Sequence, residues 1–362
     1  MNSRERVLTC FDHREPDCVP RRASLTAGVL DACRERLGID DPADHWRWDI
    51  REIRMLSPDP APDLRERFRP YLAALDGEWT LSWDQAYYGP EWGIPERPSH
   101  LYHLSMPVPP LQTASINDVR GYPFPDYVGE WRHDHLEREI AALQREGYAV
   151  NAHVGWIFQT AWTLRSEERL FEDFYSSPDL ANLLLDRITE IRVAQVERFA
   201  QAGVDLIALN DDIGSQRAMM ISPRMWRRWL KPRLAEVIAA AKRVSPGVKF
   251  RYHSDGIYLP VIPELIAIGV DSLITVQQEV MDAVAIKREF GRDLVLEGTI
   301  GLQSELSQGP SDAIRDLVRR QCEALMAGGG WLASPGNDIT PDIPVENLEV
   351  MFAALDAFGG CR

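Results

Sequence analysis

Short apolar segments alternate with longer amphipathic segments from residue 148 to the end of the chain. The apolar segments have the length of strands and cover 148–156, 204–211, 248–255, 271–276, 293–300 and 329–336. The stretches between them repeat apolar residues with the period of a helix. Strands that alternate with helices are joined by crossover connections, so the pattern predicts βα units and a parallel sheet.

Two of the helical stretches are long enough for their ends to be predicted. The first covers 177–203, where Ser177 can cap the start of a helix and Gly203 can end it. The second covers 223–244 and carries its apolar residues at helical spacing.

The first part of the chain is 1–147, and up to about residue 130 it is rich in Pro, Trp, Tyr and Arg and has little periodicity. It reads as irregular elaboration, although the apolar segment 18–25 predicts a seventh strand and 76–84 an eighth. Eight parallel strands with alternating helices close as a (β/α)8 TIM barrel, so we expect a single α/β domain over 1–362, with regular βα units over 148–362. An open doubly wound sheet is the alternative, and it is disfavoured because no GxGxxG follows an early strand.

Composition narrows the possible partners and the location. The chain has 362 residues and a formal net charge of −15, which would repel the phosphate backbone of a nucleic acid. No stretch approaches the ~18 apolar residues of a membrane span, and the first residues lack a secretory signal, so we expect a cytoplasmic protein without membrane contact. Five widely spaced cysteines without a CxxC pair suggest reduced thiols and no cysteine-rich zinc site.

Polar side chains stand where the predicted strands end. In a barrel, reactive residues lie at the carboxyl ends of the strands, so we expect these side chains to converge on one mouth. They are Arg21, Arg22, His153, Trp156, Asn210, Asp211, Asp212, His253, Ser254, Asp255, Gln277, Glu297, Asn337 and Asp338. Buried polar groups need partners or a ligand, which favours an active site over a bare scaffold.

The segment RYHSDG carries the most specific signal. His253 and Asp255 can converge on one ligand from the end of a strand and the turn that follows. The alternative is a hydrogen-bonded core histidine, and the same alternative applies to His153.

The neighbouring carboxylates also have two interpretations. Asp211 and Asp212 could share a proton or hold a cation; alternatively Asp212 caps the following turn while Asp211 meets a basic residue. We expect one of the two to be functional. Glu297 follows an apolar run and could enter the mouth or form a salt bridge with a neighbouring strand.

An ordered series of motifs resembles the uroporphyrinogen decarboxylase superfamily, in particular its branch of corrinoid-linked, methyltransferase-like proteins. The motifs are RERVLTCFDHREPDCVP near the start, EWGI at 91–94, YPFPD at 122–126, NDDIGSQRAMMISPRMWRRWLKPRL from 210, HSDGIYLPVIPELIAIGVDSLITVQ, KREFGRDLVLEGTIGLQSEL and GGGWLASPGNDITPDIPVENLEVMFAAL. The resemblance runs nearly end to end and implies a TIM barrel with its site at the C-terminal mouth. It also makes a homodimer a reasonable expectation.

Departures from the family pattern bear on the reaction. A true uroporphyrinogen decarboxylase would carry an RQAGR-type motif and an SDIL-type motif, and this chain has PRRASLT and SWDQAYY instead. Tetrapyrrole decarboxylation is therefore not expected, although Arg21 and Arg22 could hold a smaller carboxylate. The methyltransferase branch shows HxCG and a later cysteine that together bind zinc. Here HSDG and PGND put Asp255 and either Asn337 or Asp338 at those positions.

The resemblance thus implies a harder donor set, suited to Zn²⁺ or another divalent metal, with His253, Asp255 and Asp338 as expected ligands. The alternative is a site without a metal, with the histidine and the carboxylates as acid and base. The catalytic residues expected on either basis are His253, Asp255, Asp212 and Glu297. The expected substrate-binding residues are Arg21, Arg22, His153, Trp156, Asn210, Asp211, Gln216, Gln277 and Asn337.

Three functions follow. The first is methyl transfer on a small molecule, with a corrinoid on a separate partner protein as methyl donor or recipient. The second is a metal-independent decarboxylase or related lyase, in which Arg21 or Arg22 grips a carboxylate and Asp211 or Asp212 stabilises charge or moves a proton. The third is a non-catalytic ligand-binding barrel.

Overall fold

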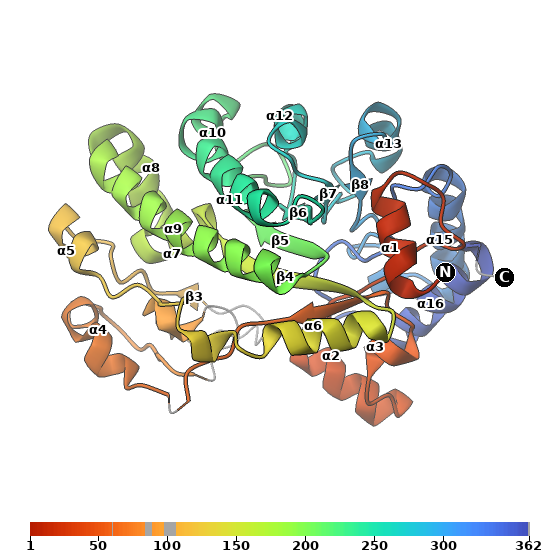
Figure 1. Cartoon of the computed structure of the whole chain (residues 1–362), viewed down its shortest axis with the longest axis horizontal. Helices are drawn as coiled ribbons and strands as arrows, with labels where there is room; N and C mark the ends of the chain where they lie inside the picture. Colours follow the sequence, from red (N-terminus) through yellow and green to blue (C-terminus); the bar gives the residue numbers. More distant parts are fainter. Residues whose placement is uncertain (60, 84–88, 98–105, 361–362) are drawn as a thin grey trace.

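The computed structural model describes residues 1–59, 61–83, 89–97 and 106–360, and its centre is a parallel sheet (Figure 1). The hydrogen-bonded order of the sheet is β1-β4-β5-β6-β7-β8. These strands are β1 (Ile50–Ile53), β4 (Ala149–Trp156), β5 (Leu206–Asn210), β6 (Lys249–His253), β7 (Ser272–Leu273) and β8 (Val295–Leu296). The predicted strands over 148–300 are therefore confirmed, with shorter bounds.

Two further segments close the sheet into a cylinder. Leu296 of β8 forms a parallel bridge with Trp331, and Ala333 forms one with Arg21. The carbonyl of Arg21 in turn accepts a hydrogen bond from the backbone N–H of Asp49, directly before β1, at 2.9 Å. The six strands and these two bridged segments take the eight strand positions of a TIM barrel. The predicted strands at 18–25 and 329–336 are present as bridged segments rather than as full ladders.

The second strand of the barrel lies at another place in the chain than the sequence predicted. The sequence indicated 76–84, but Thr80 forms only an antiparallel bridge with Glu96, and residue 84 lies outside the described residues. The barrel uses β1 instead, where Ile50 and Ile53 enclose two charged residues. This spacing breaks the two-residue alternation by which a strand is recognised.

Helices surround the sheet (Figure 1). Their bounds are α1 (Ser3–Phe11), α2 (Ala27–Ala32), α3 (Pro42–His45), α4 (Leu64–Leu72), α5 (Ile116–Gly121), α6 (Leu136–Arg145), α7 (Phe158–Arg165), α8 (Glu167–Ser176), α9 (Pro178–Ala202), α10 (Pro223–Trp229), α11 (Lys231–Val244), α12 (Ile262–Ala267), α13 (Ala283–Phe290), α14 (Glu305–Gln308), α15 (Ser311–Leu325) and α16 (Val345–Phe358). A small antiparallel pair joins β2 (Glu96–Arg97) to β3 (Met106–Pro107). None of the helices in the described ranges has the length and apolar composition that a membrane crossing requires.

The two long predicted helices differ in how well their bounds were read. α9 runs from Pro178 to Ala202 and ends at Gly203, whose φ of +89° suits glycine. Ser177 is the residue before it but makes no capping hydrogen bond through its side chain. The stretch 223–244 is split into α10 and α11, because the proline at position 232 cannot donate to the preceding turn.

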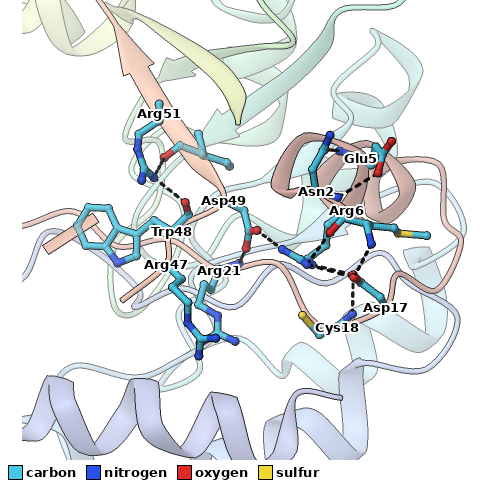
Figure 2. Close-up of polar contacts among 12 residues, drawn as sticks. Asn2, Glu5, Arg6, Asp17, Cys18, Arg21, Arg47, Trp48, Asp49 and Arg51 are labelled. Atoms are coloured by element: carbon cyan, nitrogen blue, oxygen red, sulfur yellow. Dashed lines mark hydrogen bonds and ion pairs between the residues drawn. The ribbon is translucent and has the colours of Figure 1, made fainter. Parts of the chain in front are cut away.

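A cluster of charged residues connects the N-terminal helix to the amino ends of the first strands of the barrel (Figure 2). Arg6 of α1 donates from Nη1 to Asp49 at 2.6 Å and from Nε to Asp17 at 2.8 Å. Asp17 also accepts from the N-terminal amine at 2.9 Å. Cys18 next to it is disulfide-bonded, whereas Cys10, Cys33 and Cys322 are free and buried. The expectation of reduced thiols is therefore wrong for Cys18.

This cluster predicts a stability change in acid. Burial by itself raises the pKa of Asp17, but the hydrogen bonds from Arg6 and the N-terminal amine outweigh burial and lower it to about 2 from 3.8. A carboxyl whose pKa is depressed by folding stabilises the fold above its unfolded pKa and loses this contribution as the pH falls toward its folded pKa. The urea midpoint of unfolding should therefore fall less in Asp17→Asn than in the wild type as the pH is lowered from 3.8 to about 2. Urea unfolding at several pH values measures it, with the exposed Asp40→Asn as control; an unchanged decline would contradict it.

Candidate active site

Three side chains at the ends of neighbouring strands converge on one point. β5 ends at Asn210 and β6 at His253, and these two residues are register partners. Nε2 of His253 lies 3.6 Å from a carboxylate oxygen of Asp212 and 3.6 Å from one of Asp255. One ligand atom from each of the three lies within 4.8 Å of the others, and no second group of this kind occurs in the described ranges. We call it the Asp212–His253–Asp255 group.

Two glycines allow the loops that carry the carboxylates to pack together. Gly256 has a φ of +70°, and a Cβ there would lie 2.4 Å from the carbonyl oxygen of Ser215. A Cβ on Gly214 would lie 2.6 Å from the carbonyl oxygen of Asp255. Because glycine has no side chain, the two loops can approach closely at these positions. The N–H of Asp255 then donates to Asp212 at 2.9 Å.

The imidazole of His253 is held in one orientation from behind. The hydroxyl of Thr275 lies 2.7 Å from Nδ1 of His253 and 2.9 Å from the carbonyl oxygen of Gly336. A carbonyl can only accept, so Thr275 gives its single proton to Gly336 and accepts a hydrogen bond from Nδ1–H. The neutral ring therefore presents the lone pair of Nε2 to the two carboxylates. The lone pair of Nε2 and those of the two carboxylates repel one another. The arrangement is therefore stable only if the three groups share a cation or if the ring is protonated.

The donor chemistry of the group fits a divalent ion. Two ligand atoms bound to one tetrahedral Zn²⁺ lie about 3.4 Å apart, which follows from metal–ligand distances of about 2.0–2.1 Å. The N···O distances of 3.6 Å in this group are close to that value. Metal-binding histidines commonly donate their other N–H to a fixed acceptor, which Thr275 supplies here. One nitrogen and two carboxylate oxygens suit Zn²⁺ and harder divalent metals.

Asn337 supports the group, and Asp338 stands outside it. The amide Nδ2 of Asn337 donates to both carboxylate oxygens of Asp255, at 3.1 and 2.9 Å. Burial raises the pKa of Asp255, and the charge of His253 opposes this effect. Asp338 is exposed and does not join the group. The geometry thus puts Asp212 where the sequence suggested Asp338, because the loop after β5 comes closer to His253.

The adjacent carboxylates Asp211 and Asp212 have separate roles. Oδ1 of Asp211 accepts hydrogen bonds from the backbone N–H groups of residues 157, 158 and 159, at 3.0, 2.7 and 3.2 Å. These donors are the start of α7, so Asp211 caps that helix from a different strand. Burial raises the pKa of Asp211 to about 7, and the three N–H donors oppose the rise. Of the pair, only Asp212 faces His253, and Asp211 neither meets a basic residue directly nor faces the mouth.

Glu297 lies inside the barrel rather than at its mouth. Its side chain is fully buried and accepts from Nε of Arg251 at 2.9 Å and from the hydroxyl of Ser272. Burial raises the pKa of Glu297, but the adjacent guanidinium outweighs this and lowers it. Of the two alternatives for Glu297, the salt bridge is the one present, so its expected place at the mouth was wrong.

The two predicted arginines point in opposite directions. Successive residues of an extended segment face opposite sides, so only one of them can face the interior of the barrel. Arg21 pairs with Asp356 of α16 at 2.6 Å, at the amino ends of the strands beside the cluster of Figure 2. Arg21 was therefore wrongly expected at the mouth. Arg22 lies 3.7 Å from Glu52 and faces Arg251 and Glu297 inside the barrel.

The predicted glutamines form one edge of the mouth. Nε2 of Gln216 donates to Gln277 at 2.9 Å, and Gln277 donates back at 3.2 Å. Oε1 of Gln277 also accepts from the N–H of Gly256 at 3.2 Å, beside the loop that carries Asp255. These amides therefore lie beside the Asp212–His253–Asp255 group.

His153 and Trp156 border a separate cavity of about 380 Å³ at the end of β4. A register shift between them bulges the strand, and Gly155 takes a φ of +86° within it. A Cβ on Gly155 would lie 2.9 Å from Nη2 of Arg192, so glycine lets that guanidinium approach. Asn210 hydrogen-bonds to His153, whose pKa is lowered to about 4 by burial and by Arg192.

Sequence reasoning did not identify the residues of α9 and of the first 130 positions that line this cavity. They include Arg54, Tyr127, Arg192 and Gln195. The available signal was a basic residue on the buried face of a predicted helix, since Arg192 is only 3% exposed. Arginine is almost never fully buried unless it is paired, so such a position points to a ligand or a partner.

Comparisons with known proteins place the chain in a family. The family model "Uroporphyrinogen decarboxylase (URO-D)" matches residues 107–358. The chain is 29% identical over 180 residues to the methylcobamide:CoM methyltransferase MtaA of Methanosarcina barkeri, which is 50% of each protein. It is 24% identical over 192 residues to the uroporphyrinogen decarboxylase of Coxiella burnetii, 51% of this chain and 49% of that protein. The chain thus spans about half the length of the curated relatives it matches.

A solved structure agrees with the barrel. The structure of a methyltransferase from Methanosarcina mazei superposes with a TM-score of 0.64 and 19% identity, and the match covers 99% of each chain. At this identity the match shows a shared fold. The family match includes β4 to β8 and all three members of the Asp212–His253–Asp255 group. The chain therefore belongs to the uroporphyrinogen decarboxylase family, and its similarities fit the methyltransferase-like branch of that family.

Proposed function

We propose that the protein is an enzyme that transfers a methyl group between a small molecule and a corrinoid carried by a separate protein. The observation that carries the proposal is the Asp212–His253–Asp255 group, in which Nε2 of a fixed imidazole faces two carboxylates. Similarity to a methylcobamide:CoM methyltransferase over half of the chain supports it. The homodimer expected from the family resemblance stays a prediction.

Asp212, His253 and Asp255 would hold Zn²⁺ or another divalent metal. The two carboxylates balance the charge of a divalent ion, so the loaded site would be formally neutral. A divalent ion bound there would lower the pKa of a thiol or hydroxyl of the methyl acceptor and so strengthen it as a nucleophile. Because carboxylates are harder ligands than thiolates, this site would accept a wider range of metals than a cysteine site.

The chain's own residues would orient the reaction around this group. Thr275 fixes the ring of His253, and Asn337 fixes the carboxylate of Asp255. The side chains of Asp212, His253 and Asp255 remain 24%, 11% and 39% exposed, so a substrate can reach them. Such pre-positioned ligands need little rearrangement when the substrate binds.

A metal-independent decarboxylase or lyase is the second candidate. The same geometry suits a protonated His253 between two carboxylates, since each N···O distance is 3.6 Å. When a substrate carboxylate leaves as carbon dioxide, the electron pair of the broken C–C bond stays on carbon. The imidazolium would then give its proton to that carbon.

The metal content of the purified chain separates the two candidates. We expect about one divalent ion per chain in the wild type and almost none in His253→Ala, because a lost ligand weakens binding sharply. His45→Ala is the matched control, since His45 is an exposed histidine paired with Glu349 on α3 and α16. Loss of metal in His253→Ala should accompany loss of methyl transfer from methylcobalamin to a small thiol. Metal-free wild-type protein after supplementation would contradict the proposal and favour the lyase.

A further inference from the structure

The cavity at the end of β4 contains two arginines without a carboxylate partner among the described residues. The guanidinium of Arg192 donates to three neutral acceptors, the carbonyl of Trp156 at 3.1 Å, Oε1 of Gln195 at 2.8 Å and Oγ1 of Thr160 at 3.3 Å. A guanidinium has five N–H donors, so two remain. The side chain of Arg54 lines the same cavity and forms no ion pair with any described residue.

Two carboxylates interact electrostatically with residues that line the cavity, Glu91 with Tyr127 and Asp211 with Arg192, and both have other hydrogen-bond partners. Glu91 forms a buried pair with Arg132. Asp211 accepts hydrogen bonds from the backbone N–H groups at the start of α7. The cavity therefore has a positive charge in a chain whose net charge is −15, and a buried cation without a counter-ion is costly unless a ligand supplies one.

Flat and apolar side chains form the walls of this cavity. The ring of Trp92 lies 4.9 Å from the guanidinium carbon of Arg192. Three further aromatic rings line the space: Tyr127, Trp156 and Phe199. Nε2 of His153 is buried at the edge and has no hydrogen-bond partner in the described part of the chain. A cavity of about 380 Å³ in which polar side chains converge between aromatic walls has the size and lining of a small-molecule site.

This cavity adjoins the Asp212–His253–Asp255 group. Trp156 of β4 is the register partner of Asn210 of β5, which is the partner of His253 of β6. Neighbouring strands lie about 4.8 Å apart, so the backbones of Trp156 and His253 are roughly 10 Å apart. One small molecule can therefore reach from the arginines to the group.

We infer that this cavity binds the carboxylate end of the substrate, and that the substrate is a small acid with a flat, aromatic body. Arg192 and Arg54 pair with the carboxylate, the aromatic walls enclose the body, and the reacting end extends toward His253. The inference rests on the proposed function for what happens at that reacting end. Binding in the cavity, however, needs only the arginines and the walls.

Benzoate and benzamide test the inference on the full chain. They have the same shape, but only benzoate is charged. We expect benzoate to raise the unfolding temperature and to bind in calorimetric titration, and benzamide and inorganic phosphate to do neither. In Arg192→Met and in Arg54→Met, benzoate binding should weaken at least about tenfold, as for the loss of a charge-assisted hydrogen bond. Arg187→Met is the matched control, an exposed arginine on α9 that pairs with Glu190.

Arg54→Met keeps the test valid if removal of the buried Arg192 impairs folding, because Arg54 is exposed. Equal binding of benzamide, equal binding of phosphate, or unchanged benzoate binding in Arg54→Met would overturn the inference. The His253→Ala variant separates it from the proposed function, since benzoate should still bind there. A wild type that lacks metal but binds benzoate through Arg54 would overturn the proposed function and leave this inference standing.

Discussion

Replacing Glu297 by alanine should lower the free energy of unfolding by about 3–5 kcal/mol, the cost of leaving one member of a buried ion pair alone. The carboxylate is fully buried and takes hydrogen bonds from Arg251 and Ser272 in the interior of the barrel. Its removal leaves the guanidinium of Arg251, which is also fully buried, without its ion-pair partner. The same guanidinium donates a hydrogen bond to Oδ1 of Asn151 on β4 at 2.9 Å, so the loss of Glu297 should also destabilise β4.

Denaturant unfolding followed by circular dichroism measures this loss. The double variant Arg251→Met with Glu297→Leu should recover much of it, since it removes both charges and keeps apolar volume. Glu323→Ala, which breaks an exposed ion pair with Arg319 on α15, should leave the unfolding midpoint unchanged. A Glu297→Ala midpoint equal to that of Glu323→Ala would show that the buried pair does not stabilise the barrel.

Methyl transfer should fall about a thousandfold in Asp255→Asn and in Asp212→Asn, which corresponds to roughly 4 kcal/mol of activation free energy. An amide is a weaker metal ligand than a carboxylate and cannot neutralise a divalent ion. Thr275→Val should reduce metal affinity by about 10- to 100-fold, because it removes the acceptor that fixes the ring of His253. Metal titration and the rate of methylcobalamin demethylation with a small thiol measure these effects.

Asp338→Asn distinguishes the geometry from the sequence prediction. Asp338 is exposed and outside the Asp212–His253–Asp255 group, so its amide variant should keep both metal affinity and rate. A loss in Asp338→Asn as large as that in Asp212→Asn would mean that the loop after residue 336 closes onto the metal, as the sequence motif suggested.

The barrel itself could be predicted from local patterns. β5 is a continuous apolar run that ends at Asn210, which is how a strand buried on both faces appears in a sequence. β4 and β6 are also buried along most of their length, although they carry Asn151 and Arg251. β1 could not be found in this way, because it presents Arg51 and Glu52 between two isoleucines. Glu52 accepts a hydrogen bond from Asn151 at 2.7 Å, so its polar character is explained by a partner 99 residues away.

The sequence predicts those parts of the candidate site that lie within one short segment at the end of a strand. His253 and Asp255 belong to one short segment, and glycine after them marks the sharp turn that brings both to the mouth. The choice between Asp212 and Asp338 was not local. It depends on which of two distant loops packs against β6, and the contact of Gly214 with the Asp255 loop decides it.

By itself, the sequence determined the fold class, the positions of most strands and the histidine at the end of β6. These follow from periodicity and from residue order along a single segment. Only the tertiary structure decided that Arg21 faces away from the mouth, that Glu297 is neutralised by Arg251, and that Arg192 has no carboxylate partner in the described ranges. Whether a charged side chain is paired depends on segments far apart in the chain, and closure of the barrel determines which of them meet.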